Sequence, residues 1–250
     1  MKKHLSILIL IVAAFCSLIK SAEAVPSLQL YLPDADYYEV SPWFPASGDS
    51  WITTSNPFDL QVAGATTPNW VNYIGNVELH IALLEDEYLL YQGLTTSFLT
   101  IKDNDPDIDF EKVLYATDFS FGKPSGVSTH GVYDSYFASV NLPNLLMGSA
   151  GETVYDYNKD FDPLNPDASG KDSGDIQHYT ISYDPRFAFI HFDATGTVYN
   201  EAGKTKDVFA PYSHDADVAP IPEPTSLLLL GSGLFALKMF SRGKGKAKKA

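Results

Sequence analysis

Oxygen-bearing side chains alternate with other residues in two short segments, and this spacing could bind a metal ion. In the first segment they stand at every second position, as Asp156, Asn158, Asp160 and Asp162. Calcium prefers carboxylate and amide oxygens supplied by such loops. The segment is not an EF-hand, because Phe161 stands where that loop needs glycine. We predict a looser calcium site at these four residues, with a solvated acidic loop as the alternative.

The second segment carries four aspartates at alternate positions: Asp103, Asp105, Asp107 and Asp109. The same chemistry and the same alternative apply, because a cation would offset carboxylates that otherwise repel one another. Calcium is the cofactor that these residues suggest.

The histidines are spread along the chain instead of being grouped. None has the His-x-His or His-Glu-x-x-His spacing that places two imidazoles on one metal ion. We expect packing or surface roles for His80, His130, His178, His191 and His214. The sequence also lacks a Gly-x-Ser-x-Gly elbow, a phosphate-binding glycine loop and a dinucleotide fingerprint. We therefore predict that the chain is not an enzyme.

Aromatic residues offer a second kind of binding chemistry. Trp43 and Trp51 have aromatic neighbours such as Phe44 and Tyr37, and flat aromatic faces can stack on sugar rings. Trp43 and Trp51 are thus candidate glycan-binding residues. The alternative is ordinary packing in a β-sheet core.

The elements that must position these residues are strands, because the hydrophobic pattern has a period of two. It is clearest in residues 28–32, 77–83 and 176–183, and further β-rich runs cover 98–101, 113–121, 132–140, 187–193 and 195–199. No amphipathic helix of convincing length occurs. The pattern predicts an all-β fold, an antiparallel, jelly-roll-like β-sandwich, with a barrel as the second choice.

One domain is expected to occupy residues 25–220. Two of the 31 acidic and nine of the 17 basic residues lie outside it, so the domain carries 29 against 8, a net charge of −21. Such a surface repels nucleic acid and attracts cations. Solubility outside the cell is a simpler explanation of the same charge.

The N-terminus predicts export. Lys2 and Lys3 precede an apolar stretch over 5–19, and the Ala22-Glu23-Ala24 pattern fits signal peptidase. We predict a signal peptide over residues 1–24 with cleavage between Ala24 and Val25. The single cysteine, Cys16, falls within it, so the mature chain would hold no disulfide.

The C-terminus, residues 221–250, is organised as a sorting signal. Pro222-Glu223-Pro224 is followed by an apolar stretch over about 226–240 and then by a basic tail. The stretch is predicted to be a transmembrane helix with the basic tail on the cytoplasmic side. This order of features resembles the PEP-CTERM sorting signal. The resemblance implies recognition at Pro222, Glu223 and Pro224 by a membrane-embedded exosortase and removal of the tail.

The central domain has a resemblance of its own. Residues 27–31, 51–58, 129–137 and 209–216 are similar in type and order to the choice-anchor N family, exported domains that carry alternative C-terminal anchors. Thr129 and Asp134 stand where that pattern tends to have proline. The resemblance implies a location and an architecture, without an established activity.

Together these features predict an exported protein of the cell surface or extracellular matrix, held transiently in the inner membrane. We expect a structural or adhesive role with exopolysaccharide, as in a biofilm. The expected partners are signal peptidase, exosortase, the membrane and extracellular polysaccharide, and not nucleic acid. The alternative function is a carbohydrate-binding module or a weak glycan-active hydrolase.

Overall fold

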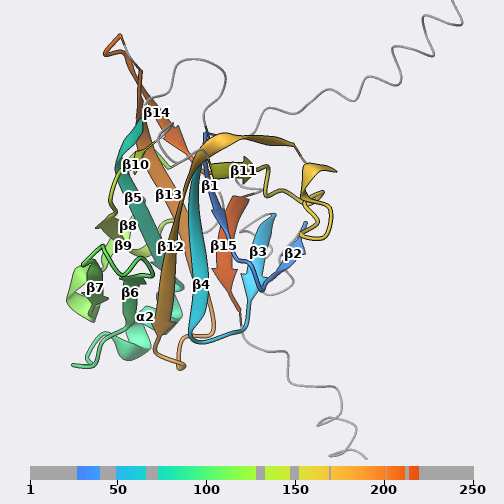
Figure 1. Cartoon of the computed structure of the whole chain (residues 1–250). Coiled ribbons are helices and arrows are strands. Elements are labelled where there is room, and N and C mark those ends of the chain that lie inside the picture. The colour runs from blue at the N-terminus through green and yellow to red at the C-terminus, as the bar shows by residue number, and fades with distance from the viewer. Residues whose placement is uncertain are drawn as a thin grey trace, which may run out of the picture. The chain divides into compact units, whose positions relative to one another are not determined.

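The computed structural model describes residues 27–39, 49–65, 73–127, 133–146, 152–168, 170–200, 202–211 and 214–219 (Figure 1). All of them belong to the first of two compact units, residues 1–219, and the second unit covers 220–250. The predicted signal peptide, the predicted transmembrane helix and Trp43 lie outside the described residues.

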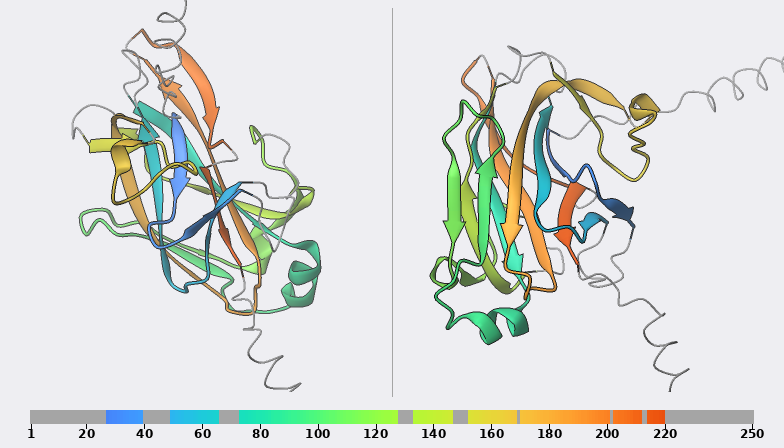
Figure 2. Two further views of the ribbon diagram at one scale, coloured as in Figure 1. Left: turned by 90° about the vertical axis from the view of Figure 1, so that its right-hand side faces the viewer. Right: turned by 60° about the horizontal axis from the view of Figure 1, so that its bottom comes forward.

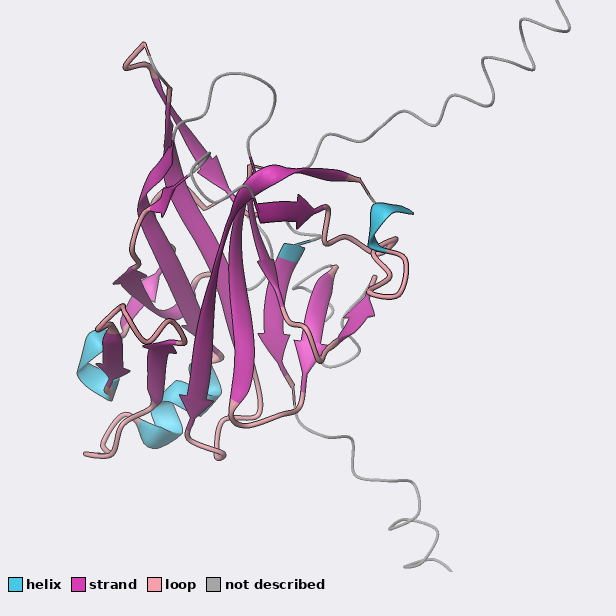
Figure 3. Cartoon of the chain, viewed as in Figure 1, coloured by secondary structure: helices cyan, strands magenta, loops and turns pink. Residues whose placement is uncertain are grey.

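Strands dominate the described part of the chain, and helices are few and short (Figure 3). The helical elements are α2 (Glu85–Tyr91), η1 (Ala116–Asp118) and η2 (Pro166–Ala168). Within the described ranges, no helix has the length and hydropathy needed to cross a membrane. The all-β class predicted from the alternating pattern is confirmed.

The first sheet has six described strands, with β12 at its centre (Figure 2). The strand order is β1 (Leu28–Tyr31), β4 (Phe58–Ala65), β12 (Lys171–Tyr183), β6 (Leu99–Asp103) and β7 (Glu111–Leu114), with β11 (Glu152–Tyr155) also paired to β12. All of its described pairs are antiparallel.

The second sheet has nine described strands, and β13 lies between β15 and β5. The strand order is β2 (Asp36–Tyr38), β3 (Ser50–Thr53), β15 (Asp215–Val218), β13 (Ile190–Tyr199), β5 (Tyr73–Leu83), β9 (Ser135–Asn141) and β8 (Ser120–Gly122); β10 (Leu145–Leu146) also pairs with β5, and β14 (Thr205–Phe209) with β13. One pair departs from the predicted antiparallel arrangement, because β3 and β15 are parallel. These strands are far apart in sequence, so no hairpin turn dictates their direction.

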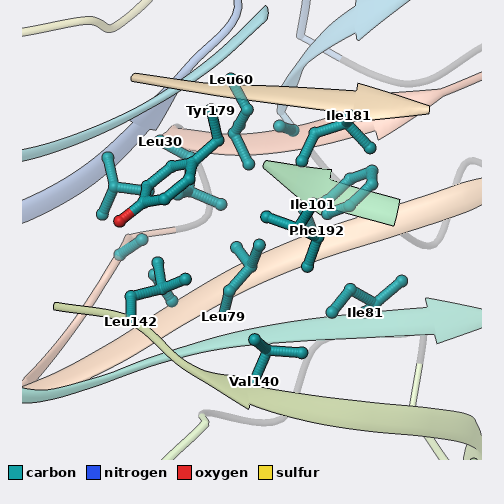
Figure 4. Close-up of a cluster of buried hydrophobic side chains, with 14 of the residues drawn as sticks. Leu30, Leu60, Leu79, Ile81, Ile101, Val140, Leu142, Tyr179, Ile181 and Phe192 are labelled. Atoms are coloured by element: carbon teal, nitrogen blue, oxygen red, sulfur yellow. The ribbon is translucent and has the colours of Figure 1, made fainter. Parts of the chain in front are cut away.

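The core lies between the two sheets. Alternate residues of β4, β6 and β12 meet alternate residues of β5, β9 and β13, and all of the side chains drawn in the close-up are buried hydrophobic ones (Figure 4). Burying each large apolar side chain contributes roughly 1.5–3 kcal/mol. This packing holds β13 in place, and with it the polar residues on the opposite face of β13.

Candidate functional site

Strand β13 carries apolar and polar residues in alternation, although nearly all of them are buried. Phe192 points into the core between the sheets (Figure 4). Because successive side chains of a strand point to opposite faces, His191 and Asp193 lie on the other face of the sheet. Both are buried, with exposed fractions of 0% and 2%.

Strand β15 brings further carboxylates to the same face. Asp217 pairs in register with His191, and the core residue Ala216 pairs with Phe192. By alternation Asp215 and Asp217 lie on the side of His191, and both have exposed fractions of 0%. We call the group formed by His191, Asp193, Asp215, Asp217, Tyr133 and Ser50 the carboxylate–histidine array.

The imidazole of His191 lies between two carboxylates. Its Nδ1 is 2.7 Å from Oδ1 of Asp217, and its Nε2 is 3.1 Å from Oδ2 of Asp193. The hydroxyl of Ser50, on β3, donates to the other oxygen of Asp217 at 2.7 Å. The hydroxyl of Tyr133 donates to Oδ2 of Asp193 at 2.5 Å. Four separate segments of the chain therefore meet at one buried group.

Burial and charge oppose each other at His191. Burial alone would lower the pKa of the imidazole, but the carboxylates of Asp193 and Asp217 outweigh it and raise this pKa to about 10. The pKa of Asp215 is raised well above its ordinary value by burial, and then by the adjacent carboxylates of Asp193 and Asp217. At neutral pH the array thus holds an imidazolium, and the Asp215 carboxyl keeps its proton to a higher pH than an ordinary aspartate.

A second buried histidine lies beside the array with a different environment. His80 on β5 is bonded through its two ring nitrogens to the hydroxyls of Ser139 and Thr195, each at 2.8 Å. Burial lowers the pKa of His80 to about 4, against the opposing charge of Asp193. His80 is therefore neutral at physiological pH, whereas His191 is charged.

The array has the residue types of a metal centre, but its side chains are buried and not open to solvent. In the described part of the chain, His191, Asp193 and Asp215 are the one group of three potential metal ligands whose atoms all lie within 4.8 Å of one another. Their near-complete burial leaves no room for a substrate at these carboxylates. The arrangement suits a bound ion or a structural role.

Sequence reasoning missed this site. A packing or surface role was predicted for each histidine, and His191 is buried as a packing role requires. Its contacts with two aspartates were not foreseen. The available signal was a polar residue at every second position of otherwise apolar strands, in His191-Phe192-Asp193 and in Asp215-Ala216-Asp217. Such a pattern normally marks a solvent-facing side, and here that side is buried.

Three of the four predicted calcium ligands make side-chain hydrogen bonds within the protein. Asp156 is buried, with its Oδ1 2.6 Å from Nε2 of His214, and its Oδ2 accepts a hydrogen bond from the amide of Asn158. Asn158 and Asp162 accept backbone hydrogen bonds within their own loop. Within the described ranges, Asp156, Asp160 and Asp162 do not bring their oxygens within 4.8 Å. Calcium binding by this loop stays a prediction.

The structure describes one of the two candidate tryptophans, Trp51. Trp51 has an exposed fraction of 5%, and its indole nitrogen donates to the carbonyl of Tyr157 at 2.7 Å. The rings of Tyr31 and Tyr37 pack against it edge-on at 4.9 and 5.3 Å. Trp51 therefore has no free face for a sugar ring, and its expected role in glycan stacking does not fit. Trp43 lies outside the described residues.

The comparisons with known proteins bear on the C-terminus. Residues 220–244 match the model of the PEP-CTERM protein-sorting motif, which includes Pro222, Glu223 and Pro224. The predicted sorting resemblance is confirmed, and the motif marks this chain as an exported protein that exosortase targets for surface sorting. The resemblance of the central domain to choice-anchor N proteins is not shown. The three motif residues, like the signal-peptide residues Ala22, Ala24 and Val25, lie outside the described part of the structure.

The other two comparisons assign neither a family nor a function to the chain. No curated protein matches the chain. Among solved structures, a chain of the "Iho670 Flagellar-like Filament" aligns at 10% identity over 85% of this chain and 94% of its own length, with a TM-score of 0.14. A similarity this low carries no argument about fold or function.

Proposed function

We propose that this chain is an exosortase-processed protein with a structural or adhesive role at the cell surface or in the extracellular matrix, in association with exopolysaccharide. The observation that carries the proposal is the sorting motif at residues 220–244. The motif begins two residues after the end of β15, the strand that carries Asp215 and Asp217. Export and sorting therefore deliver the whole β-sandwich to the outside.

Two features of the sandwich favour a structural role over catalysis. His191, Asp193 and Asp217 contact one another and are buried. A substrate would therefore not reach these side chains. The sandwich's charge of −21 favours solubility and cation binding in a hydrated matrix. The alternative of a glycan-binding module loses Trp51 as a stacking surface, and it then rests on Trp43.

The processing step is tested by expressing the full chain in two otherwise identical hosts, with and without exosortase. A variant with alanine at Pro222, Glu223 and Pro224 serves as the recognition mutant, and Asp107→Ala in an exposed loop serves as the matched control. We expect the wild-type chain and the control to be shortened and moved to the surface fraction in the exosortase host alone. Equal length and location of wild type and recognition mutant in both hosts would refute processing.

The matrix role is tested on the processed protein. We expect it to co-purify with the extracellular polysaccharide and to be released when the polysaccharide is removed. Saturable binding to isolated glycan that is lost on Trp43→Ala would instead favour the carbohydrate-binding alternative. Recovery of the protein entirely in the polysaccharide-free medium would argue against both.

A further inference from the structure

The carboxylate–histidine array has the ligand types of a transition-metal site. One ring nitrogen of His191 and one carboxylate oxygen each of Asp193 and Asp215 lie within 4.8 Å of one another. One imidazole nitrogen with two carboxylates is a donor set that suits zinc, whereas calcium takes six to eight oxygens. The three residues lie on adjacent strands, β13 and β15, whose pairing fixes their separation.

The spacing of the donor atoms agrees with that assignment. Ligands at about 2.1 Å from a tetrahedral zinc ion lie about 3.4 Å from each other. The Nε2 of His191 and Oδ2 of Asp193 are hydrogen-bonded at 3.1 Å, so zinc would take the place of the proton between two atoms that already have nearly this separation.

Residues outside the donor set orient the imidazole. The other ring nitrogen of His191 faces Asp217 at 2.7 Å, and Ser50 donates to the second oxygen of Asp217. Histidines that bind metals in proteins commonly donate their second N–H to a carboxylate, which fixes the tautomer and the ring orientation. Asp217 and Ser50 would serve His191 in this way.

The burial of the carboxyl groups is compatible with a bound cation. The array places three aspartates and one histidine in a site whose carboxyl groups all have exposed fractions of 2% or less. Buried carboxylates are strongly destabilising unless positive charge or hydrogen bonds compensate them. In the structure the imidazolium of His191 and the hydroxyls of Ser50 and Tyr133 provide this compensation. A divalent ion held by His191, Asp193 and Asp215 would replace the proton on His191.

The chain also has few other means of cross-linking its strands outside the cell. Its single cysteine is Cys16, so residues 17–250 contain no pair of cysteines for a disulfide. A structural metal ion is an alternative cross-link for exported domains. Here the ion would join β13 to β15 and, through Ser50, to β3.

We propose that His191, Asp193 and Asp215 bind one divalent metal ion of the zinc class as a structural centre, with Asp217 as a positioning residue. This proposal goes beyond the proposed surface function and does not depend on exosortase processing. Its failure would leave the sorting experiment unaffected.

The test uses the full chain, purified without chelator, and measures its metal content and its melting temperature. We expect close to one zinc-class ion per chain, a lower melting temperature after treatment with a chelator, and recovery with added zinc but not with calcium. Negligible metal content together with a melting temperature indifferent to chelator and zinc would overturn the proposal. Recovery with calcium alone would overturn it as well.

Single substitutions test which residues bind the ion. Asp215→Asn should abolish stoichiometric zinc binding, and Asp217→Asn should weaken it by about 10- to 100-fold, the usual effect of losing a residue that orients a ligand. Asp156→Asn is the matched control, because Asp156 is also buried and bonded to a histidine, His214, but lies outside the donor set. Equal zinc binding by all three variants would contradict the assignment. If a variant fails to fold, the wild-type measurement decides.

Discussion

Carboxylates gather in two kinds of region in this protein, and the two differ in what the side chains contact. In the acidic loops the oxygens accept hydrogen bonds from backbone amides two residues ahead, as Asp103 does from Asp105 and Asp105 from Asp107. In the array the carboxylates contact side chains from other segments, His191, Tyr133 and Ser50. Closeness in sequence therefore produces local turns, while convergence in space depends on strand pairing.

The largest expected effect is a loss of unfolding free energy in the array that has no counterpart in an acidic loop. Asp217→Ala removes the partner of a buried imidazolium, and breaking such a buried pair costs about 3–5 kcal/mol. Asp107→Ala in the exposed loop should change the free energy of unfolding by no more than about 0.5 kcal/mol. Urea denaturation of both variants and the wild type measures the difference. Similar losses of unfolding free energy in the two variants would show that the array and the loop do not differ in this way.

Asp156 is the intermediate case, because it begins an acidic loop and is nevertheless buried against His214. Asp156→Ala leaves His214 and Asn158 without this carboxylate, and we expect a loss of about 1–3 kcal/mol, the cost of buried polar groups left unsatisfied.

Asp160→Ala, four residues further along the same loop and exposed, is the control for Asp156→Ala and should be nearly neutral. Both values come from the same denaturation series. A loss at Asp160 equal to that at Asp156 would show that the loop as a whole, and not the buried contact, provides the stability.

The smallest expected effect comes from an ion pair near the surface. The side-chain hydrogen bond from Arg186 lowers the pKa of Asp184, although partial burial opposes it. A lowered pKa in the folded state means that the pair stabilises the protein above the ordinary pKa of aspartate. This stabilisation is lost as the pH falls through the lowered value.

Arg186→Ala should therefore melt slightly below the wild type at pH 7, and the two melting temperatures should converge as the pH falls below the lowered pKa of Asp184. Thermal melts across that range test the sign. The difference should be smaller than that of either buried variant, because the Arg186 side chain is exposed to solvent. A difference that widens on acidification would contradict the assignment.

Much of the architecture follows from local pattern. The alternation of apolar residues over 77–83 and 176–183 correctly indicated β5 and β12. The run over 113–121 was harder to interpret, because it divides into β7, η1 and β8. Two predicted runs, 187–193 and 195–199, join into the single strand β13. Element type is thus encoded locally, while the positions where strands end depend on neighbours.

The amino-acid sequence by itself determined the all-β class, through side-chain alternation. It also determined the sorting signal, because the match at residues 220–244 is to a linear motif. Tertiary structure alone decided the array. His191 and Asp193 are 22 or more residues from Asp215 and Asp217 in the chain. They meet because β13 pairs with β15, and Ser50 joins them because β15 pairs in parallel with β3. Strand order is a property of the whole packed core, and no local pattern specifies it.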